Sequence, residues 1–159
     1  MLVFKLEMNN GMAEKVKAIQ EASKEALILA VRMWHDNMLP KHFRHGAAVK
    51  YNYAQRQMKY QRHKQKKGSP PALVYTGRAR DTLLNSVFVV TYSKDRAVGK
   101  FVVGNQIKYF WMTPSNQPNK PQEMKKTLPK ESAQIGAFIA DYVAKKANNP
   151  KAINKVVIS

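Results

Sequence analysis

The chain has 159 residues, of which 28 are Lys or Arg and 10 are Asp or Glu, so its formal net charge at pH 7 is +18. A chain of about 150 residues buries about 70% of its unfolded surface, so residues 1–159 suit a single domain with a real core. The sequence contains no Cys, which excludes disulfides, thiolate nucleophiles and cysteine metal sites. This composition favours folding in a reducing cytoplasm.

The start of the chain, MLVFKLEMNN, lacks a basic leader followed by an apolar block. The most apolar window, ALILAVRMW, is short and contains Arg32. We therefore expect neither secretion by that route nor a membrane span, and no membrane partner.

The first elements expected are an edge strand from Leu2 to Met8 and a turn at Asn9-Asn10-Gly11. Apolar residues then recur at helical spacing from Met12 to Met38, which predicts one long helix. That helix would measure about 40 Å at 1.5 Å per residue. We expect Pro40 to end it.

The middle of the chain predicts strands. The segments SVFVVTY and AVGKFVV are rich in β-branched and aromatic residues and flank the polar turn Ser93-Lys94-Asp95-Arg96, which indicates a hairpin. The segment IKYFWM is expected to be a third strand or an extended segment. The following TPSNQPNKPQ has three prolines and no periodicity, which is typical of a surface loop.

A final helix is expected after Thr127, which can cap it, with Pro129 in its first turn. Asn148-Asn149-Pro150 should end this helix. Its apolar stripe should pack on the sheet beside the first helix, and the stripe residues are Ile135, Phe138, Ile139, Tyr142 and Val143. The expected fold class is α+β, in which a small antiparallel sheet packs against a long N-terminal helix and a C-terminal helix, with a basic extended arm.

Positive charge is concentrated in one segment, because there is not one carboxylate between Asp36 and Asp81. Such a field attracts phosphate or an acidic protein surface and repels copies of itself. His42, His45 and His63 lie among the cations of this segment. The cations expected to contact a partner or DNA are Lys41, Arg44, Lys50, Arg56, Lys59, Arg62, Lys64, Lys66, Lys67, Arg78 and Arg80.

A basic, Tyr-rich arm is expected at about residues 41–72. Tyr51, Tyr53 and Tyr60 are interleaved with its cations, a mixture that can stack on bases while it neutralises phosphates. Alternatively, the tyrosines pack on the domain and the cations point to water. Because a structureless loop of this length is uncommon inside a compact domain, we expect the arm to become ordered against a neighbouring subunit.

The stretch LVYTGRAR suggests a hook at the end of this arm. Val74 and Tyr75 would anchor it in the core, and Gly77 would turn the chain with a positive φ. In an extended chain, residues two apart point to the same face, so Arg78 and Arg80 would form a fork for phosphates or carboxylates. The alternative is a solvated turn without a partner.

Catalytic groups are weakly represented. The pair His42 and His45 has no nearby Cys or Glu and sits among cations that would repel a divalent ion. Asp81 and Asp95 stand alone, and Thr76-Gly77-Arg78 lacks the flanking pattern of a nucleotide-binding loop. We therefore expect no catalytic residue, no metal and no cofactor, and we do not expect an enzyme.

The order of four segments resembles tailed-bacteriophage neck and tail-completion proteins, a family also described as virion morphogenesis or minor tail proteins. The resemblance runs from Leu39 to Val143, about two thirds of the chain. The acidic residues usual in that family before the last helix are reduced here to Glu123 and Glu131. The segments are LPKHFRHGAAVKYNY, RQMKYQRHKQKKGSPPALVYTGRARDTL, IKYFWM and NQPNKPQEMKKTLPKESAQIGAFIADYV.

The resemblance implies a structural protein of the virion that forms a homo-oligomeric ring, commonly of six or twelve copies, at the joint between head and tail. Its partners would be copies of itself, the adjoining connector or adaptor and tail-terminator proteins, and packaged DNA in the lumen. It would reside in the neck of the virion, and in the host cytoplasm during assembly. The alternative is a free nucleic-acid-binding protein that uses the basic arm.

Overall fold

The structure is a computed structural model that describes residues 10–71, 73–74, 77–93, 96–102, 107–111 and 118–148, except for the side chains of residues 10–13, 108 and 109. The expected edge strand from Leu2 to Met8 lies outside the described residues, as do Tyr75 and half of the predicted loop at 113–122. The other half of that loop is described, and it is helical from Lys120 onward. The α+β class, with a long first helix, a small antiparallel sheet and a C-terminal helix, is confirmed.

The long first helix is confirmed as α1 (Asn10–Met33), which continues through a π-helical turn (Trp34–Met38) into a 3₁₀ turn (Leu39–Phe43). Asn10 and Gly11, expected to form a turn, belong to the first turn of this helix. Pro40 occupies the first turn of the 3₁₀ segment. Because proline has no backbone N–H, it cannot extend the α-helical hydrogen-bond ladder, and the tighter turn accommodates it at a helix start. The proline therefore changes the helix type, and the continuous helical segment that began with α1 ends at Phe43.

The predicted hairpin is confirmed as β1 (Val87–Ser93) and β2 (Arg96–Val102), paired antiparallel from Val87 opposite Val102 to Ser93 opposite Arg96. Side chains alternate between a half-buried inner face and an exposed outer face. The inner face packs on α1 so closely that a Cβ at Gly99 would collide with the ring of Phe88 and lie 2.8 Å from Val31 Cγ1. Only glycine lets the strand approach the helix to this extent.

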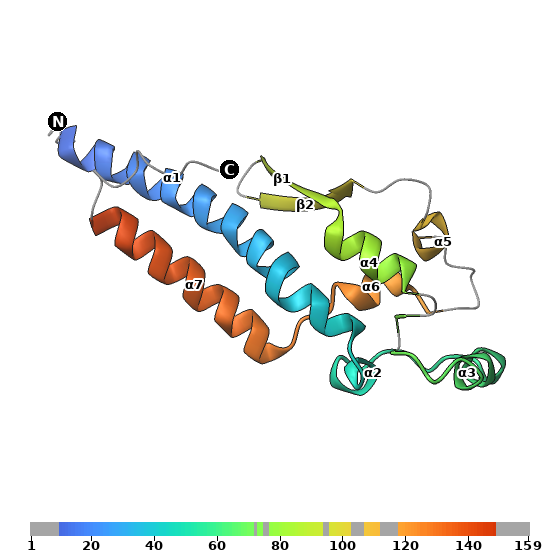
Figure 1. The fold of residues 1–159 in the computed structure, drawn as a ribbon. Helices are drawn as coiled ribbons and strands as arrows, with labels where there is room; N and C mark the ends of the chain where they lie inside the picture. The colour runs from blue at the N-terminus through green and yellow to red at the C-terminus, as the bar shows by residue number, and fades with distance from the viewer. Residues whose placement is uncertain are drawn as a thin grey trace, which may run out of the picture.

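The C-terminal helix α7 (Pro129–Asn148) lies along α1, on a different side of that helix from the hairpin (Figure 1). The Tyr142 hydroxyl donates to Glu25 Oε2 at 2.8 Å, and Lys146 Nζ lies 3.6 Å from the same oxygen. The prediction that the apolar stripe of α7 packs on the sheet was therefore wrong, because α1 lies between α7 and the hairpin. All five stripe residues are half-buried.

The start of α7 also differs from the prediction. Leu128, and not Thr127, directly precedes the helix, and its backbone N–H donates to Glu131 Oε2 at 3.1 Å. A glutamate in the first turn that reaches back to this N–H is half of a capping box. Thr127 instead places its hydroxyl 3.1 Å from that of Ser132.

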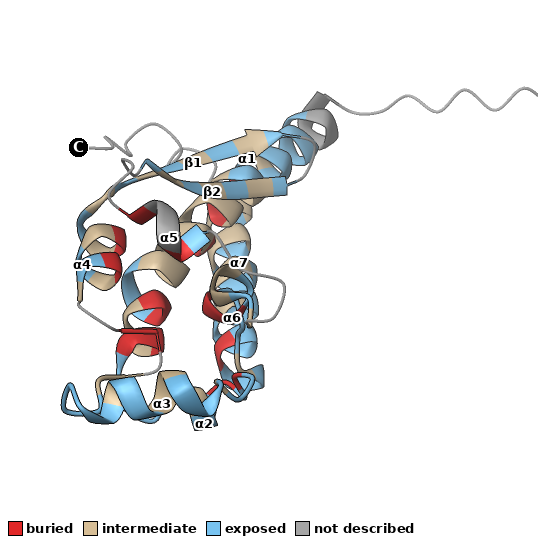
Figure 2. Ribbon diagram, turned by 90° about the vertical axis from the view of Figure 1, so that its right-hand side faces the viewer, coloured by how far each residue is buried: buried red, intermediate tan, exposed pale blue. Residues whose placement is uncertain are grey.

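In the described part of the chain, five short helices follow the first helix, and all of them except α3 contribute residues to the main core. They are α2 (Ala47–Lys50), α3 (Met58–Gln65), α4 (Arg78–Asn85), α5 (Lys108–Trp111) and α6 (Lys120–Met124). Figure 2 shows buried residues in this half of the molecule, away from the first turns of α1. The core cluster contains Leu39, Phe43, Ala47, Tyr51, Tyr53, Leu73, Val74, Ala79, Leu83, Ile107, Phe110 and Met124.

The segment IKYFWM is not a strand. Ile107 begins a helical turn that continues as α5, and Ile107 and Phe110 are both buried. Residues three apart share one face of a helix, whereas a strand would point them to opposite faces. An unbroken apolar run does not distinguish between these cases by periodicity, which explains the error.

Candidate functional site

The basic segment divides into a packed part and a projecting part. Tyr51 and Tyr53 lie in the core with 3% and 9% of their surface exposed, and His42 is fully buried. These two tyrosines therefore pack on the domain and are unavailable to stack on bases. The region expected to be poorly ordered in a lone subunit is thus built into the core as far as Tyr53, and α3 follows as the part that projects (Figure 1).

A polar network holds the packed part together. His42 Nδ1 lies 2.5 Å from the Tyr53 hydroxyl, and the His42 ring stacks on Tyr51 with centroids 3.9 Å apart. The Tyr51 hydroxyl donates to Glu131 Oε1 at 2.8 Å, and Lys41 Nζ lies 3.5 Å from the same oxygen. Burial raises the pKa of Tyr51, and its hydrogen bond to Glu131 raises it further.

Glu131 is charged although it is buried. Burial alone would raise the pKa of this carboxyl, but the hydrogen bonds from Leu128 and Tyr51 and the charge of Lys41 outweigh it and hold the pKa below its ordinary value. Burial lowers the pKa of His42 to about 4, and the negative charge of Glu131 offsets only part of that effect. His42 is therefore a neutral core residue at pH 7 and adds nothing to the cationic surface.

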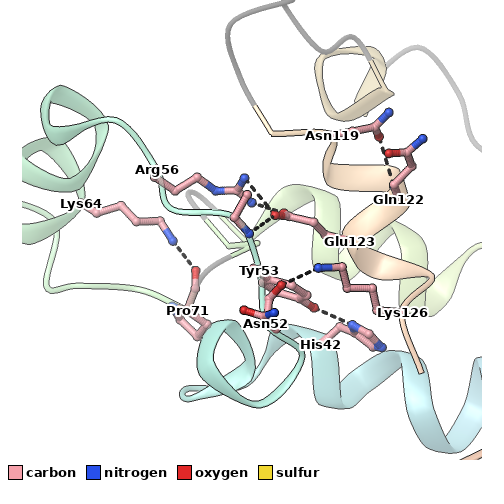
Figure 3. A network of polar contacts seen from close by, with 11 residues as sticks. His42, Asn52, Tyr53, Arg56, Lys64, Pro71, Asn119, Gln122, Glu123 and Lys126 are labelled. Carbon is pink, nitrogen blue, oxygen red and sulfur yellow. Dashed lines mark hydrogen bonds and ion pairs between the residues drawn. The ribbon is translucent and has the colours of Figure 1, made fainter. Parts of the chain in front are cut away.

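A second buried carboxylate, Glu123, fixes the base of the projecting part (Figure 3). Glu123 Oε1 accepts hydrogen bonds from the Ala54 backbone N–H at 3.0 Å and from Arg56 Nη1 at 3.3 Å, and Oε2 accepts a short one from Arg56 Nη2. Asn119 caps α6 by accepting from the Gln122 N–H at 3.1 Å, which orients the helix that carries Glu123. Glu123 and Glu131 are therefore internal anchors, so they offer no acidic surface to a partner.

The far end of α3 is anchored by Lys64. Its ammonium donates to the carbonyl oxygen of Pro70 at 3.1 Å and, through a short hydrogen bond, to that of Pro71 (Figure 3). Burial lowers the pKa of Lys64 to about 8, and the positive charge of Arg56 adds to the effect. Gly68, with φ of +77°, turns the chain so that 64–71 closes on itself.

The candidate cations thus fall into two groups. Four are bound by oxygen atoms of the chain: Lys41 by Glu131, Arg56 by Glu123, Lys64 by two carbonyl oxygens, and Arg80 by Asp81 at 2.7 Å. Among the exposed cations, the ammonium of Lys50 lies 5.9 Å from the ring centre of Tyr51. The exposed cations are Arg44, Lys50, Lys59, Arg62, Lys66, Lys67 and Arg78. The cations that remain candidates for contact with a partner or DNA are therefore the exposed ones.

The predicted fork of Arg78 and Arg80 was wrong. Gly77 has the expected positive φ of +84°, but it precedes helix α4, in which both arginines lie. Residues two apart on a helix point about 200° away from each other. Ala79 and Leu83, four apart, are buried and draw the segment into a helix, and Asp81 neutralises Arg80. Val74 is buried as expected.

The exposed basic residues of α3, together with Lys66 directly after it, lie on one face. Lys59, Arg62, His63 and Lys66 line a single shallow hollow of the surface. Their spacing of three, four and seven residues places them on one side of a helix. This spacing is visible in the sequence and was the signal that could have grouped the four residues on one face.

Two apolar surfaces were missed altogether. The outer face of the hairpin exposes Val87, Val89, Val98 and Val102, with Val87 66% and Val102 61% exposed. A cleft of about 680 Å³ lies between the end of the first helix, the inner face of the hairpin and α5, and its apolar lining includes Val31, Trp34, Phe88, Phe101, Trp111 and Met124. The strand β1 is apolar at four successive positions, Val87 to Val90. Such a run is typical of a strand that is covered on both faces.

The described residues offer neither a metal site nor a membrane-spanning helix. Within the ranges that the structure describes, no group of three or more His, Asp or Glu residues could hold a metal ion. None of the described helices is long and apolar enough to cross a membrane. No family model matches the sequence, and no curated protein or solved structure matches it either.

The buried histidine predicts a loss of stability in acid. Between pH 7 and pH 5 the free energy of unfolding should fall by about 2 kcal/mol, because His42 with a pKa of about 4 stays neutral when folded, whereas an unfolded histidine with a pKa of 6.5 takes up a proton. Denaturant unfolding at the two pH values measures this. His42→Phe should flatten the dependence, whereas His45→Phe, at an exposed position, should leave it unchanged. An equal dependence in all three proteins would contradict the assignment to His42.

Proposed function

We propose that the protein is a structural component of the virion of a tailed bacteriophage. In this proposal it forms a homo-oligomeric ring at the head-tail joint, where it connects the DNA-filled head or its adaptor to the tail. The role is mechanical and electrostatic, without catalytic turnover. The order of segments from Leu39 to Val143 that resembles neck and tail-completion proteins supports the proposal.

The observation that carries the proposal is a pair of apolar surfaces of different shape. The outer face of the hairpin is a projecting surface that bears Val87, Val89, Val98 and Val102. The cleft beside Trp34 and Trp111 is a hollow of about 680 Å³. A ring of identical subunits uses heterologous contacts, in which one patch meets a different patch of the next copy. A projecting face and a hollow on one chain are the two halves that such a contact requires.

The two-stranded hairpin itself favours assembly. A two-stranded sheet is marginally stable on its own, and its open edges expose unpaired backbone groups. The packing of its inner face on α1 stabilises it from one side only. A neighbouring copy that covers the outer valines would remove apolar surface from water.

The basic end of the molecule is compatible with this arrangement. In Figures 1 and 2 the helix α3 and the hairpin lie on opposite sides of the molecule, with the hairpin above and α3 below. Contacts through the hairpin would therefore leave the cations of α3 accessible. Because copies with a formal charge of +18 repel one another, a ring needs negative charge close to it, which DNA or an adjoining acidic protein would supply.

The experiment compares assembly of the wild-type protein and two variants by native mass spectrometry and negative-stain electron microscopy. Val89→Glu places a charge on the outer hairpin face and should abolish closed oligomers. Val49→Glu makes the same change at a residue of α2 that is 88% exposed and should assemble normally. A wild-type protein that stays monomeric at micromolar concentration and is absent from purified necks would contradict the proposal.

A second candidate is a free DNA- or RNA-binding protein, which the cationic face of α3 favours. Such a protein would bind nucleic acid with a steep dependence on salt and would remain small in solution. The valines of the hairpin would then have no function in assembly. The Val89→Glu variant separates the candidates, since a free binder should be indifferent to it.

A further inference from the structure

We propose that the exposed face of α3 binds the phosphate backbone of double-stranded DNA without reading its sequence. The inference deepens the proposed function by naming the ligand of one surface, and it rests on that function for the place where the protein meets DNA. The surface consists of Lys59, Arg62, His63 and Lys66, hereafter the α3 basic face.

The dimensions of the α3 basic face suit a duplex. The helix has eight residues, so it is about 12 Å long at 1.5 Å per residue. Each strand of duplex DNA carries one phosphate per about 3.4 Å of the helix axis, so about three phosphates of one strand lie along this length. Each of the three lysine and arginine side chains can therefore pair with its own phosphate.

No carboxylate of the described chain neutralises the α3 basic face. None of its four residues forms an ion pair in the part that the structure describes. Glu123, which binds the residues just before α3, pairs with Arg56, and Asp81, the first carboxylate after α3 in the sequence, pairs with Arg80. The potential of this face is therefore available to an external anion.

The α3 basic face is held in place before any ligand arrives. Glu123 holds the chain before α3 through Ala54 and Arg56, and Lys64 holds the chain after it through the carbonyl oxygens of Pro70 and Pro71. A surface ordered in advance binds more tightly, because less conformational entropy is lost on association. The cations used as supports are buried or half-buried, and those of the α3 basic face are exposed.

The composition of the helix favours DNA over a protein partner. The centres of protein interfaces are depleted in charge, poor in Lys and rich in aromatic residues, whereas DNA interfaces are strongly positive. Helix α3 has no buried residue, and the α3 basic face consists of two lysines, one arginine and one histidine. Met58, 71% exposed, is its one large exposed hydrophobic residue.

Burial of the neighbouring tyrosines favours a duplex over a single strand. Single-strand binders stack successive bases on exposed aromatic rings. Tyr51 and Tyr53 are buried, and Tyr60 is half-buried with the ammonium of Lys64 5.6 Å from its ring centre. The remaining chemistry is cationic, which recognises phosphates and not bases.

The test measures binding of the purified protein to a fluorescent 24-base-pair duplex of random sequence by anisotropy, over a range of salt concentrations. The variant Lys59→Gln, Arg62→Gln, Lys66→Gln removes three charges from the α3 basic face. The control Lys15→Gln, Lys17→Gln, Lys130→Gln removes three from exposed positions on α1 and α7. The slope of log K against log salt should flatten by about 2.7 in the first variant, at about 0.9 per lost phosphate contact, and stay unchanged in the control.

Several results would overturn the inference. They are no binding of the duplex by the wild-type protein, an equal loss in both triple variants, and tighter binding of the matching single strand. A fourth is binding of poly-glutamate that depends on the α3 basic face while duplex binding does not, which would assign the face to an acidic protein.

Circular dichroism would verify that both variants are folded, and the single change Lys59→Gln should flatten the slope by about 0.9 on its own. The assembly assay with Val89→Glu is independent of this measurement. Failure of DNA binding would therefore leave the ring proposal intact, and failure of assembly would leave the DNA result interpretable.

Discussion

Replacing Glu123 by Ala should lower the free energy of unfolding by about 3 to 5 kcal/mol. The carboxylate is 4% exposed and accepts hydrogen bonds from the Ala54 N–H and from both terminal nitrogens of Arg56. Its removal leaves a backbone donor without its partner and an arginine side chain, 15% exposed, without a counter-charge. Leaving a buried charge unpaired costs more than the pair itself contributes.

Denaturant unfolding of a double-mutant cycle would measure this effect. Glu123→Ala combined with Arg56→Met should lose less than the sum of the single changes, because the double variant has no unpaired charge. Asp141→Ala, which breaks the pair of Asp141 and Lys145 with both side chains mostly exposed, should change stability by less than about 1 kcal/mol. Equal losses in Glu123→Ala and Asp141→Ala would contradict the role of Glu123.

The same substitution links stability to the proposed DNA contact. Glu123 supports α3 through residues 54 and 56, so its loss should loosen the helix as well as the core. Relative to the wild-type protein, hydrogen exchange in the Glu123→Ala variant should accelerate more in α3 than in α7. Helix α7 makes no contact with Glu123 among its hydrogen bonds and ion pairs in the described chain. Salt-dependent DNA binding should weaken although none of the four residues of the α3 basic face has changed.

The elements with long periodic patterns could be predicted from the sequence. The spacing of apolar residues in α1 and α7 and the alternation of β1 and β2 report directly on which side chains face inward. These local signals gave the fold class and the hairpin. They did not give the order of layers, because the stripe of α7 fits α1 as well as it fits a sheet.

The errors arose where tertiary contacts override a local cue. The pair Thr76-Gly77 suggested an extended turn, but burial of Ala79 and Leu83 makes the next residues helical. Similarly, the cations Lys41 and Arg56 seemed available because their carboxylates are 90 and 67 residues away in sequence. An ion pair between residues so far apart in sequence produces no periodic pattern from which it could be predicted.

Replacing Phe110 by Ala should lower the free energy of unfolding by about 3 to 5 kcal/mol. Phe110 is 1% exposed, belongs to the core cluster and meets Trp111 edge-to-face with ring centroids 5.6 Å apart. Truncation removes its buried surface and leaves a cavity that the short helices around it can fill only in part. Because domains are stable by about 5 to 15 kcal/mol in total, this change approaches the limit of folding.

Phe138→Ala is the matched control for this prediction, since it makes the same chemical change on α7. Phe138 is half-buried and its ring centroid lies 6.0 Å from that of Tyr142, so part of its surface already contacts water and its truncation should cost less than about 3 kcal/mol. Thermal and denaturant unfolding would compare the two. Each kcal/mol lowers the melting temperature of a domain of this size by about 2 to 4 °C, so Phe110→Ala should melt well below Phe138→Ala. If Phe138→Ala melted below Phe110→Ala, the main core would lie between α1 and α7 and not among the short helices that follow α1.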